Sequence, residues 1–223
     1  LSLLKTTCRS DLGSNKPSRS ILMCIPVTRA KKLIAGPPVR MKGFGGMISE
    51  LEERLESFDG VDVSVLKKAR CACHDMPGFF EELIRLCVDP RPAVSDGAAW
   101  ILKAETDDGQ TFRSTLIEPL TKALDAIPSW QAKLSICPSV GGFEMTPAQA
   151  RTFYRWAEGL SEHKRPFLRA SSLHARVTIG LELNEFKTAS EAALAAAEHD
   201  TAASVRARAR NLREMVSARR DKL

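Results

Sequence analysis

The stretch Pro92-Ala-Val-Ser-Asp-Gly-Ala-Ala-Trp-Ile-Leu102 decides the fold. Its apolar residues recur at three- and four-residue spacing, which is the period of one face of an α-helix. Pro92 can begin such a helix, because the N–H that proline lacks would have no helical partner in the first turn. The stretch therefore predicts a helix that starts at Pro92 and buries the side bearing Val94, Ala98 and Leu102.

The same beginning recurs further along the chain. In two places a proline again stands two residues before a large apolar residue, and in the last place an alanine replaces the proline. The large apolar residues follow one another at steps of 36, 38 and 37 residues. A regular period of this length indicates a helical repeat. The recurring pieces are Pro92-Ala-Val94, Pro128-Ser-Trp130, Pro166-Phe-Leu168 and Ala203-Ser-Val205.

A first helix is expected before each of these second helices. We expect Thr146 to cap one first helix that begins at Pro147, and Asp62 and Asp200 to cap second helices. Trp130, in the position of a large apolar anchor, is expected in the core. The loop 138–145 contains two adjacent glycines and is expected to be flexible. The predicted first helices span 78–88, 111–126, 147–162 and 186–198.

The second-helix pieces resemble the V-R-x-x-A-A-x-A-L pattern of HEAT repeats. The pieces at 94–102, 165–173 and 200–209 carry the resemblance, with a weaker piece at 130–137. Leu116-Ile-Glu-Pro119-Leu-Thr-Lys-Ala-Leu124-Asp125 resembles the first helix of these repeats, which often contains an internal proline. The resemblance covers about residues 47–217.

Membership of the HEAT/armadillo-like family implies an all-α fold. The expected architecture is a right-handed α-solenoid of about five stacked antiparallel helix pairs. The repeat period is shorter than the usual range of about 40–47 residues. The arginine of the second-helix pattern is present only as Arg169 and Arg206, so the resemblance implies an incomplete Arg–Asp ladder between repeats.

The positive charge of the chain lies in its first part. Residues 1–46 carry a net charge of +8, and residues 47–223 carry −2, within the total of +6. We expect 1–46 to be a disordered basic tail or a non-native upstream segment, and 47–223 to be the HEAT-like domain. No apolar run is long enough to cross a bilayer, so no membrane association is expected. The cysteines show no paired pattern and no secretion signal precedes them, which favours a cytoplasmic location.

The face of the second helices that points away from the core is predicted to bind another protein. Asp96, Trp100 and Lys103 share such a face, since they are spaced i, i+4, i+7. Trp100 is a favoured interface residue, but the same side chain can instead pack on the neighbouring repeat. These residues favour a non-catalytic scaffold or adaptor without a cofactor. The candidate contact residues are Asp96, Trp100, Lys103, Lys133, Arg169 and His174.

An alternative partner is nucleic acid. One family of alkylpurine DNA glycosylases is built on HEAT-like repeats with tryptophan, aspartate and arginine on the concave surface. The resemblance allows Asp96 to stabilise a cationic centre, Trp100 to stack on a base and Arg169 to hold a phosphate. A net charge of −2 on the body argues against this alternative. The repeat resemblance also allows a HEAT protein related to lyases or phycobilin binding, with no identified chromophore site.

Two further features carry possible chemistry. The C-terminal residues Arg206, Arg208, Arg210 and Arg213 form a basic patch that suits an acidic partner or a solvated capping helix. Cys71-Ala-Cys73-His74 is a metal-like sequence, but the two thiols point to different sides of a helix. We therefore predict small buried thiols and no metal site.

Overall fold

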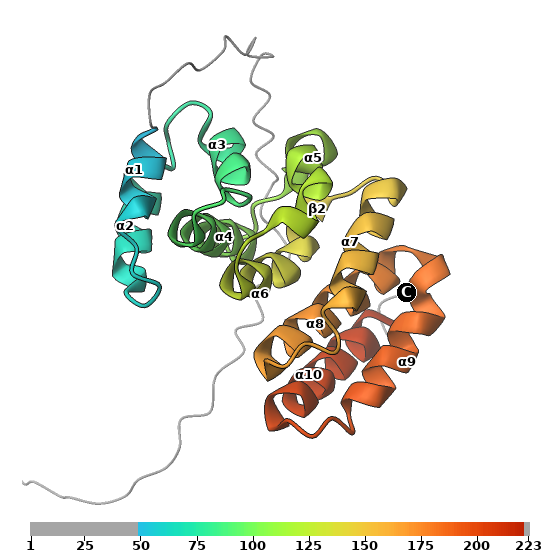
Figure 1. The fold of residues 1–223 in the computed structure, drawn as a ribbon. Coiled ribbons are helices and arrows are strands. Elements are labelled where there is room, and N and C mark those ends of the chain that lie inside the picture. Colours follow the sequence, from blue (N-terminus) through green and yellow to red (C-terminus); the bar gives the residue numbers. More distant parts are fainter. Residues whose placement is uncertain (1–48, 221–223) are drawn as a thin grey trace, which may run out of the picture. The chain divides into compact units, whose positions relative to one another are not determined.

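The computed structural model describes residues 49–220. Ten α-helices make up most of this part of the chain, and its only strands are two residues long (Figure 1). The prediction of an all-α fold is confirmed, and the predictions for 1–46 lie outside the described residues. The α-helices are α1 (Glu50–Glu56), α2 (Val63–Cys73), α3 (Phe79–Leu86), α4 (Pro92–Asp107), α5 (Ser114–Lys122), α6 (Trp130–Ser139), α7 (Pro147–Gly159), α8 (Pro166–Glu182), α9 (Lys187–Ala197) and α10 (Ala203–Arg220).

The helices contact one another in a regular order. The even-numbered helices, here called the second helices, form one series in which α4 packs on α6, α6 on α8, and α8 on α10. The odd-numbered helices α3, α5 and α7 pack in a second series. Segments about one repeat apart in sequence therefore lie next to one another, as Figure 1 shows for α8 and α10.

Several predicted helix starts are confirmed. Helices α4 and α8 begin at Pro92 and Pro166. Thr146 caps α7 in a capping box with Gln149, and the side chain of Asp62 accepts a hydrogen bond from the backbone of α2. These local signals act within one turn of helix, which explains why the sequence locates them so closely.

The start of α6 and the cap of α10 differ from the prediction, whereas the start of α10 at Ala203 agrees with it. Helix α6 begins at Trp130, because the hydroxyl of Ser129 caps it by accepting a hydrogen bond from the backbone N–H of Ala132 at 3.1 Å. Pro128 therefore stays outside the helix. Helix α10 begins at Ala203, and Asp200 accepts from the N–H of Ala202 before the helix starts.

The segment 138–145 is ordered by close packing, contrary to the predicted flexible loop. It forms a 3-10 turn, η2 (Val140–Gly142), and strand β2 (Phe143–Glu144), which pairs in parallel with strand β1 (Phe112–Arg113). A Cβ atom on Gly142 would lie 2.6 Å from the side chain of Thr106. The glycine is thus required for this segment to approach α4.

Aromatic rings link the first helices through the core. Phe80, Phe112 and Phe143 are joined edge to face at centroid distances of 5.4 and 6.0 Å, and Phe153 continues the row at 5.5 Å from Phe143. Such edge-to-face contacts fix the angle between neighbouring rings. A smaller apolar cluster joins α8, α9 and α10; its buried members are Leu173, Val177, Leu194, Ala209 and Leu212.

Candidate functional site

Three second helices bring charged side chains together around His174. The Nη1 atom of Arg208 on α10 lies 3.3 Å from the Nδ1 atom of His174 on α8. Lys103 and Asp107 on α4 also act electrostatically on this imidazole, and they form an ion pair with each other. We call Lys103, His174 and Arg208 the basic cluster. The structure thus unites two of the predicted contact residues with one residue of the predicted C-terminal patch.

The imidazole of His174 is neutral at physiological pH. Burial, together with the positive charges of Arg208 and Lys103, lowers its pKa to about 4, against the opposite effect of Asp107. A neutral ring can accept the hydrogen bond that the Arg208 guanidinium donates to Nδ1. Lys103 forms an ion pair with Asp107. Within residues 49–220 no ion pair offsets the guanidinium charge of Arg208.

Trp100 lies on α4, three residues before Lys103. Its side chain is half-buried and packs against the main hydrophobic core. Packing on the core therefore holds part of the indole, and the remainder is accessible. The structure shows the packing of Trp100, whereas its contact with a partner stays a prediction.

Asp96 faces the beginning of the next second helix. Its side chain is buried, and its Oδ1 atom accepts hydrogen bonds from the Ser129 hydroxyl and from the backbone N–H of Ala132, the latter at 2.9 Å. Burial raises the pKa of this carboxyl, and the two hydrogen bonds oppose that shift. Asp96 thus joins α4 to α6 through the N-terminus of α6.

Arg169 performs a similar task between α8 and the segment ahead of α10. Its guanidinium donates to both carboxylate oxygens of Asp200, at 3.1 and 2.8 Å, and to the backbone oxygen of His163 at 3.1 Å. Asp200 in turn accepts from the backbone ahead of α10. Arg169 is therefore placed away from the basic cluster, in a contact between consecutive repeats.

Lys133 lies in a different place, at the beginning of α6. It lines a cleft of about 330 Å³ together with residues from the end of α7 and the beginning of α8. Trp130 also lines this cleft, and the guanidinium carbon of Arg165 lies 4.1 Å above the centre of its ring. The prediction that Trp130 is a core residue is wrong, because the first position of α6 stands at the helix end, where Arg165 covers the indole.

The predicted C-terminal patch divides among several partners. Arg206 donates to the backbone oxygens of Asp200 and Thr201, and Arg213 pairs with Glu198 on α9 at 2.6 Å. Arg208 belongs to the basic cluster, and Arg210 is exposed. A helix turns about 100° per residue, so Arg206, Arg210 and Arg213 share one side of α10, whereas Arg208 lies on the opposite side.

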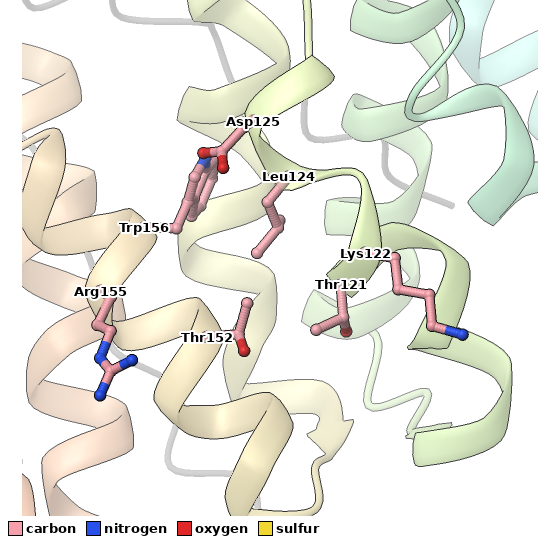
Figure 2. A pocket seen from close by; sticks show the side chains of 7 residues that line it. All are labelled: Thr121, Lys122, Leu124, Asp125, Thr152, Arg155 and Trp156. Atoms are coloured by element: carbon pink, nitrogen blue, oxygen red, sulfur yellow. The ribbon is translucent and has the colours of Figure 1, made fainter.

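A second hollow lies on the other series of helices. It has a volume of about 500 Å³ between α7 and the end of α5 (Figure 2). Asp125 and Trp156 both line the hollow, and the charged ends of Lys122 and Arg155 point to opposite sides (Figure 2). The lining combines threonine, leucine and mixed charges, and it contains no histidine or cysteine to act as base or nucleophile.

The four cysteines of the described segment are free thiols. Cys73, Cys87 and Cys137 are buried, as predicted, and Cys71 is exposed, contrary to the prediction. Burial raises the pKa of the thiols of Cys73, Cys87 and Cys137, which keeps them protonated. Within residues 49–220 no group of three or more metal-ligating side chains comes together.

Sequence reasoning missed the buried carboxylate of Glu105. Arg70 on α2 donates to it at 2.7 Å, and the Nε2 atom of His74 lies 3.5 Å from its other oxygen. Glu105 falls on the same side of α4 as Val94 and Leu102, so the helical period already signals its burial, whereas only the tertiary structure reveals its partner Arg70.

Comparison with known proteins identifies no relative: no family model, no curated protein and no solved structure matches the chain. In the part of the chain that the structure describes, no helix is both long and apolar enough to span a membrane.

Proposed function

We propose that the described helices form a HEAT-like α-solenoid. The continuous series α4, α6, α8 and α10 supports this proposal, as do the recurring helix starts about 37 residues apart. The Arg169–Asp200 ion pair between consecutive second helices fits the ladder that the HEAT pattern implies. Stacked pairs of this kind bury a core that no single pair can bury alone.

We further propose that the chain is a non-catalytic module that binds another protein through its second helices. The observation that carries this proposal is the contact between Arg208 on α10 and His174 on α8, whose imidazole is also affected by the charge of Lys103 on α4. A surface assembled from several repeats suits a partner that lies across them. Because packed helices hold its residues, little conformational entropy is lost on binding.

The chemistry of the surface suggests what part of the partner it contacts. The Arg208 guanidinium is suited to a carboxylate, and the accessible part of Trp100 is suited to an apolar side chain. We therefore expect an acidic segment that also carries apolar residues. The pairings of Asp96 and Arg169 disfavour the glycosylase alternative. Asp96 already accepts two hydrogen bonds and Arg169 is paired with Asp200, so neither is free to act on DNA.

Affinity capture with matched variants tests this function. The full chain, the variant Lys103→Glu/Arg208→Glu and the control Lys67→Glu/Lys68→Glu are used as baits in one lysate. The control reverses two charges on the exposed side of α2. Circular dichroism first establishes that all three baits are folded.

The expected result is a protein that the wild type and the control capture and the basic-cluster variant does not. Its recombinant form should then bind the variant at least about tenfold more weakly, the size of an interfacial charge contact. Equal capture by all three baits would contradict the proposed surface. Retention that disappears after nuclease treatment would contradict a protein partner.

A further inference from the structure

We propose that the cleft between the beginnings of α6 and α8 binds a phosphorylated serine or threonine side chain of a protein partner. This inference rests on the proposed function, since it assumes that the partner is a protein. The cleft concerns different residues from the basic cluster. We call it the edge cleft; its titratable lining residues are Lys133, His163, Lys164 and Arg165.

The edge cleft gathers cations without carboxylates. None of its lining residues is acidic. Within residues 49–220, no carboxylate forms an ion pair with Lys133, Lys164 or Arg165. Like charges held around one hollow repel one another, and an anion between them removes that repulsion.

Other cations of the molecule are arranged differently. Arg70, Arg85 and Arg91 each reach two or more carboxylates within 3 Å. Arg169, next to the edge cleft along α8, is paired with Asp200. The absence of an internal counter-charge thus distinguishes the edge cleft from the arginine sites that join helices.

Part of the edge cleft is held in place before any ligand binds. Arg165 is stacked over the ring of Trp130 at 4.1 Å, which limits the motion of its guanidinium. The Nδ1 atom of His163 accepts the backbone N–H of Arg165 at 3.1 Å and fixes the turn between α7 and α8. Helix α8 begins at this point, so the positive end of its dipole adds to the field in the cleft.

A compact dianion suits this arrangement better than a long polyanion. Phosphate offers a charge of about −1.5 to −2 and three acceptor oxygens to several donors at once. Residues 47–223 carry a net charge of −2, so a polyanion that extended beyond the cleft would meet repulsion. A single phosphate group contacts only the cationic side chains of the edge cleft.

The openness of the edge cleft indicates the source of the phosphate. Lys164 and Arg165 are exposed, and Lys133 and Trp130 are half-buried. Specific small-molecule sites enclose most of their ligand, which this shallow cleft does not do. A phosphate that projects from a protein surface needs only its end group to be covered. The site therefore fits a phosphorylated side chain.

Nuclear magnetic resonance titration of the ¹⁵N-labelled full chain tests the assignment. The probe is the peptide acetyl-Ala-Ala-phosphoserine-Ala-Ala-amide, and the same peptide without phosphate is the control ligand. The test variant is Lys133→Gln/Lys164→Gln, which keeps the Arg165–Trp130 stack and replaces both charges by neutral polar groups. The control variant is Lys67→Gln/Lys68→Gln on α2.

The expected result is a saturable shift confined to the backbone signals near Trp130, Lys133 and 163–165. The shift should be absent with the unphosphorylated peptide. The affinity for the phosphopeptide should be at least about tenfold weaker in the test variant and unchanged in the control variant. A response that does not saturate would overturn the proposal. So would a response that is equally strong, or equally weakened, in the test variant and the control variant. Binding of inorganic phosphate as tight as that of the peptide would overturn the assignment to a protein side chain.

Two further arms separate the remaining outcomes. Decathymidylate that shifts the same signals at lower concentration than the phosphopeptide would overturn the peptide assignment in favour of nucleic acid. The variant Lys103→Glu/Arg208→Glu should keep the phosphopeptide response, because it leaves the edge cleft intact. A saturable phosphopeptide response together with failed partner capture would reject only the proposed function. Capture that depends on the basic cluster, together with no saturable phosphopeptide response, would reject only the edge cleft.

Discussion

The Oδ1 atom of Asp96 on α4 accepts a hydrogen bond from the backbone N–H of Ala132 on α6 at 2.9 Å. This bond crosses from one helix pair to the next and gives the Ala132 N–H, in the first turn of α6, a second acceptor beside the Ser129 hydroxyl. The same oxygen accepts from the Ser129 hydroxyl, which caps that turn itself. A carboxylate predicted at a binding surface therefore fixes the spacing between consecutive second helices.

Replacing Asp96 by alanine should destabilise the fold. The Ser129 hydroxyl and the Ala132 N–H would lose a buried acceptor, at a cost of about 1–3 kcal/mol in the free energy of unfolding. Asp96→Asn should cost less, because its carbonyl oxygen can accept the same bonds. Urea denaturation of both variants measures the difference. Equal losses for alanine and asparagine would show that the hydrogen bonds are not the cause.

Removing Arg70 should be more harmful than removing an exposed arginine. Its partner Glu105 is only 2% exposed, and Arg70→Ala would leave this buried carboxylate without its arginine, at a cost of about 3 kcal/mol. The double variant Arg70→Ala/Glu105→Gln should recover part of the loss, since the buried charge is then gone. Arg54→Ala, which breaks an exposed i, i+4 pair, is the control and should change thermal unfolding very little.

Gly180 permits the close approach of α8 and α9. A Cβ atom at this position would lie 2.1 Å from the Oγ atom and 2.6 Å from the Cβ atom of Ser190, a residue that is itself buried. Gly180→Ala should therefore force the helices apart and cost about 1–3 kcal/mol. Gly159→Ala is the matched control, because nothing lies within 4 Å of its added methyl group. Comparable melting temperatures for the two variants would contradict this packing.

The stability of the fold should fall as the pH is lowered through the titration range of histidine. The folded pKa of His174 is about 4, against an ordinary value of 6.5, so the unfolded chain takes up the proton first. The stabilising contribution is complete above pH 6.5 and disappears as the pH falls towards 4. Between pH 7.5 and 5 the loss amounts to about 2 kcal/mol.

Urea denaturation at several pH values measures this dependence, with His174→Gln as the control. The variant should lack the part of the pH dependence that belongs to His174. Identical slopes for the two proteins between pH 7.5 and 5 would exclude the predicted shift. Because Arg208 and Lys103 contribute to it, the variant Lys103→Glu/Arg208→Glu should reduce the slope.

Much of the helical pattern could be predicted from the sequence. Pro92, Pro166 and the capping box at Thr146 act within a single turn, so their effect is independent of the rest of the fold. The prediction failed for 138–145, where two glycines indicated a loop. There the close contact of Gly142 with Thr106 orders the segment, and no local pattern records that contact.

The candidate site was less accessible to sequence reasoning. A period of 3.6 residues assigned Asp96 and Lys103 to one polar face, but burial differs along a helix according to what covers it. Helix α6 covers Asp96, whereas Lys103 remains beside His174. The sequence also placed Lys133 among the contact residues without indicating that Lys164 and Arg165 would join it.

The sequence by itself determined the helical class, the spacing of the repeats and several of the helix caps, because hydrophobic period and capping are properties of adjacent turns. Only the tertiary structure decided which charged side chains join helices and which meet at a surface. That outcome depends on which residues of neighbouring helices come within about 3 Å, and each such distance is set by the packing of the whole core. Asp96 and Arg169 join neighbouring second helices for this reason, whereas Arg208 contacts His174, whose imidazole Lys103 also affects.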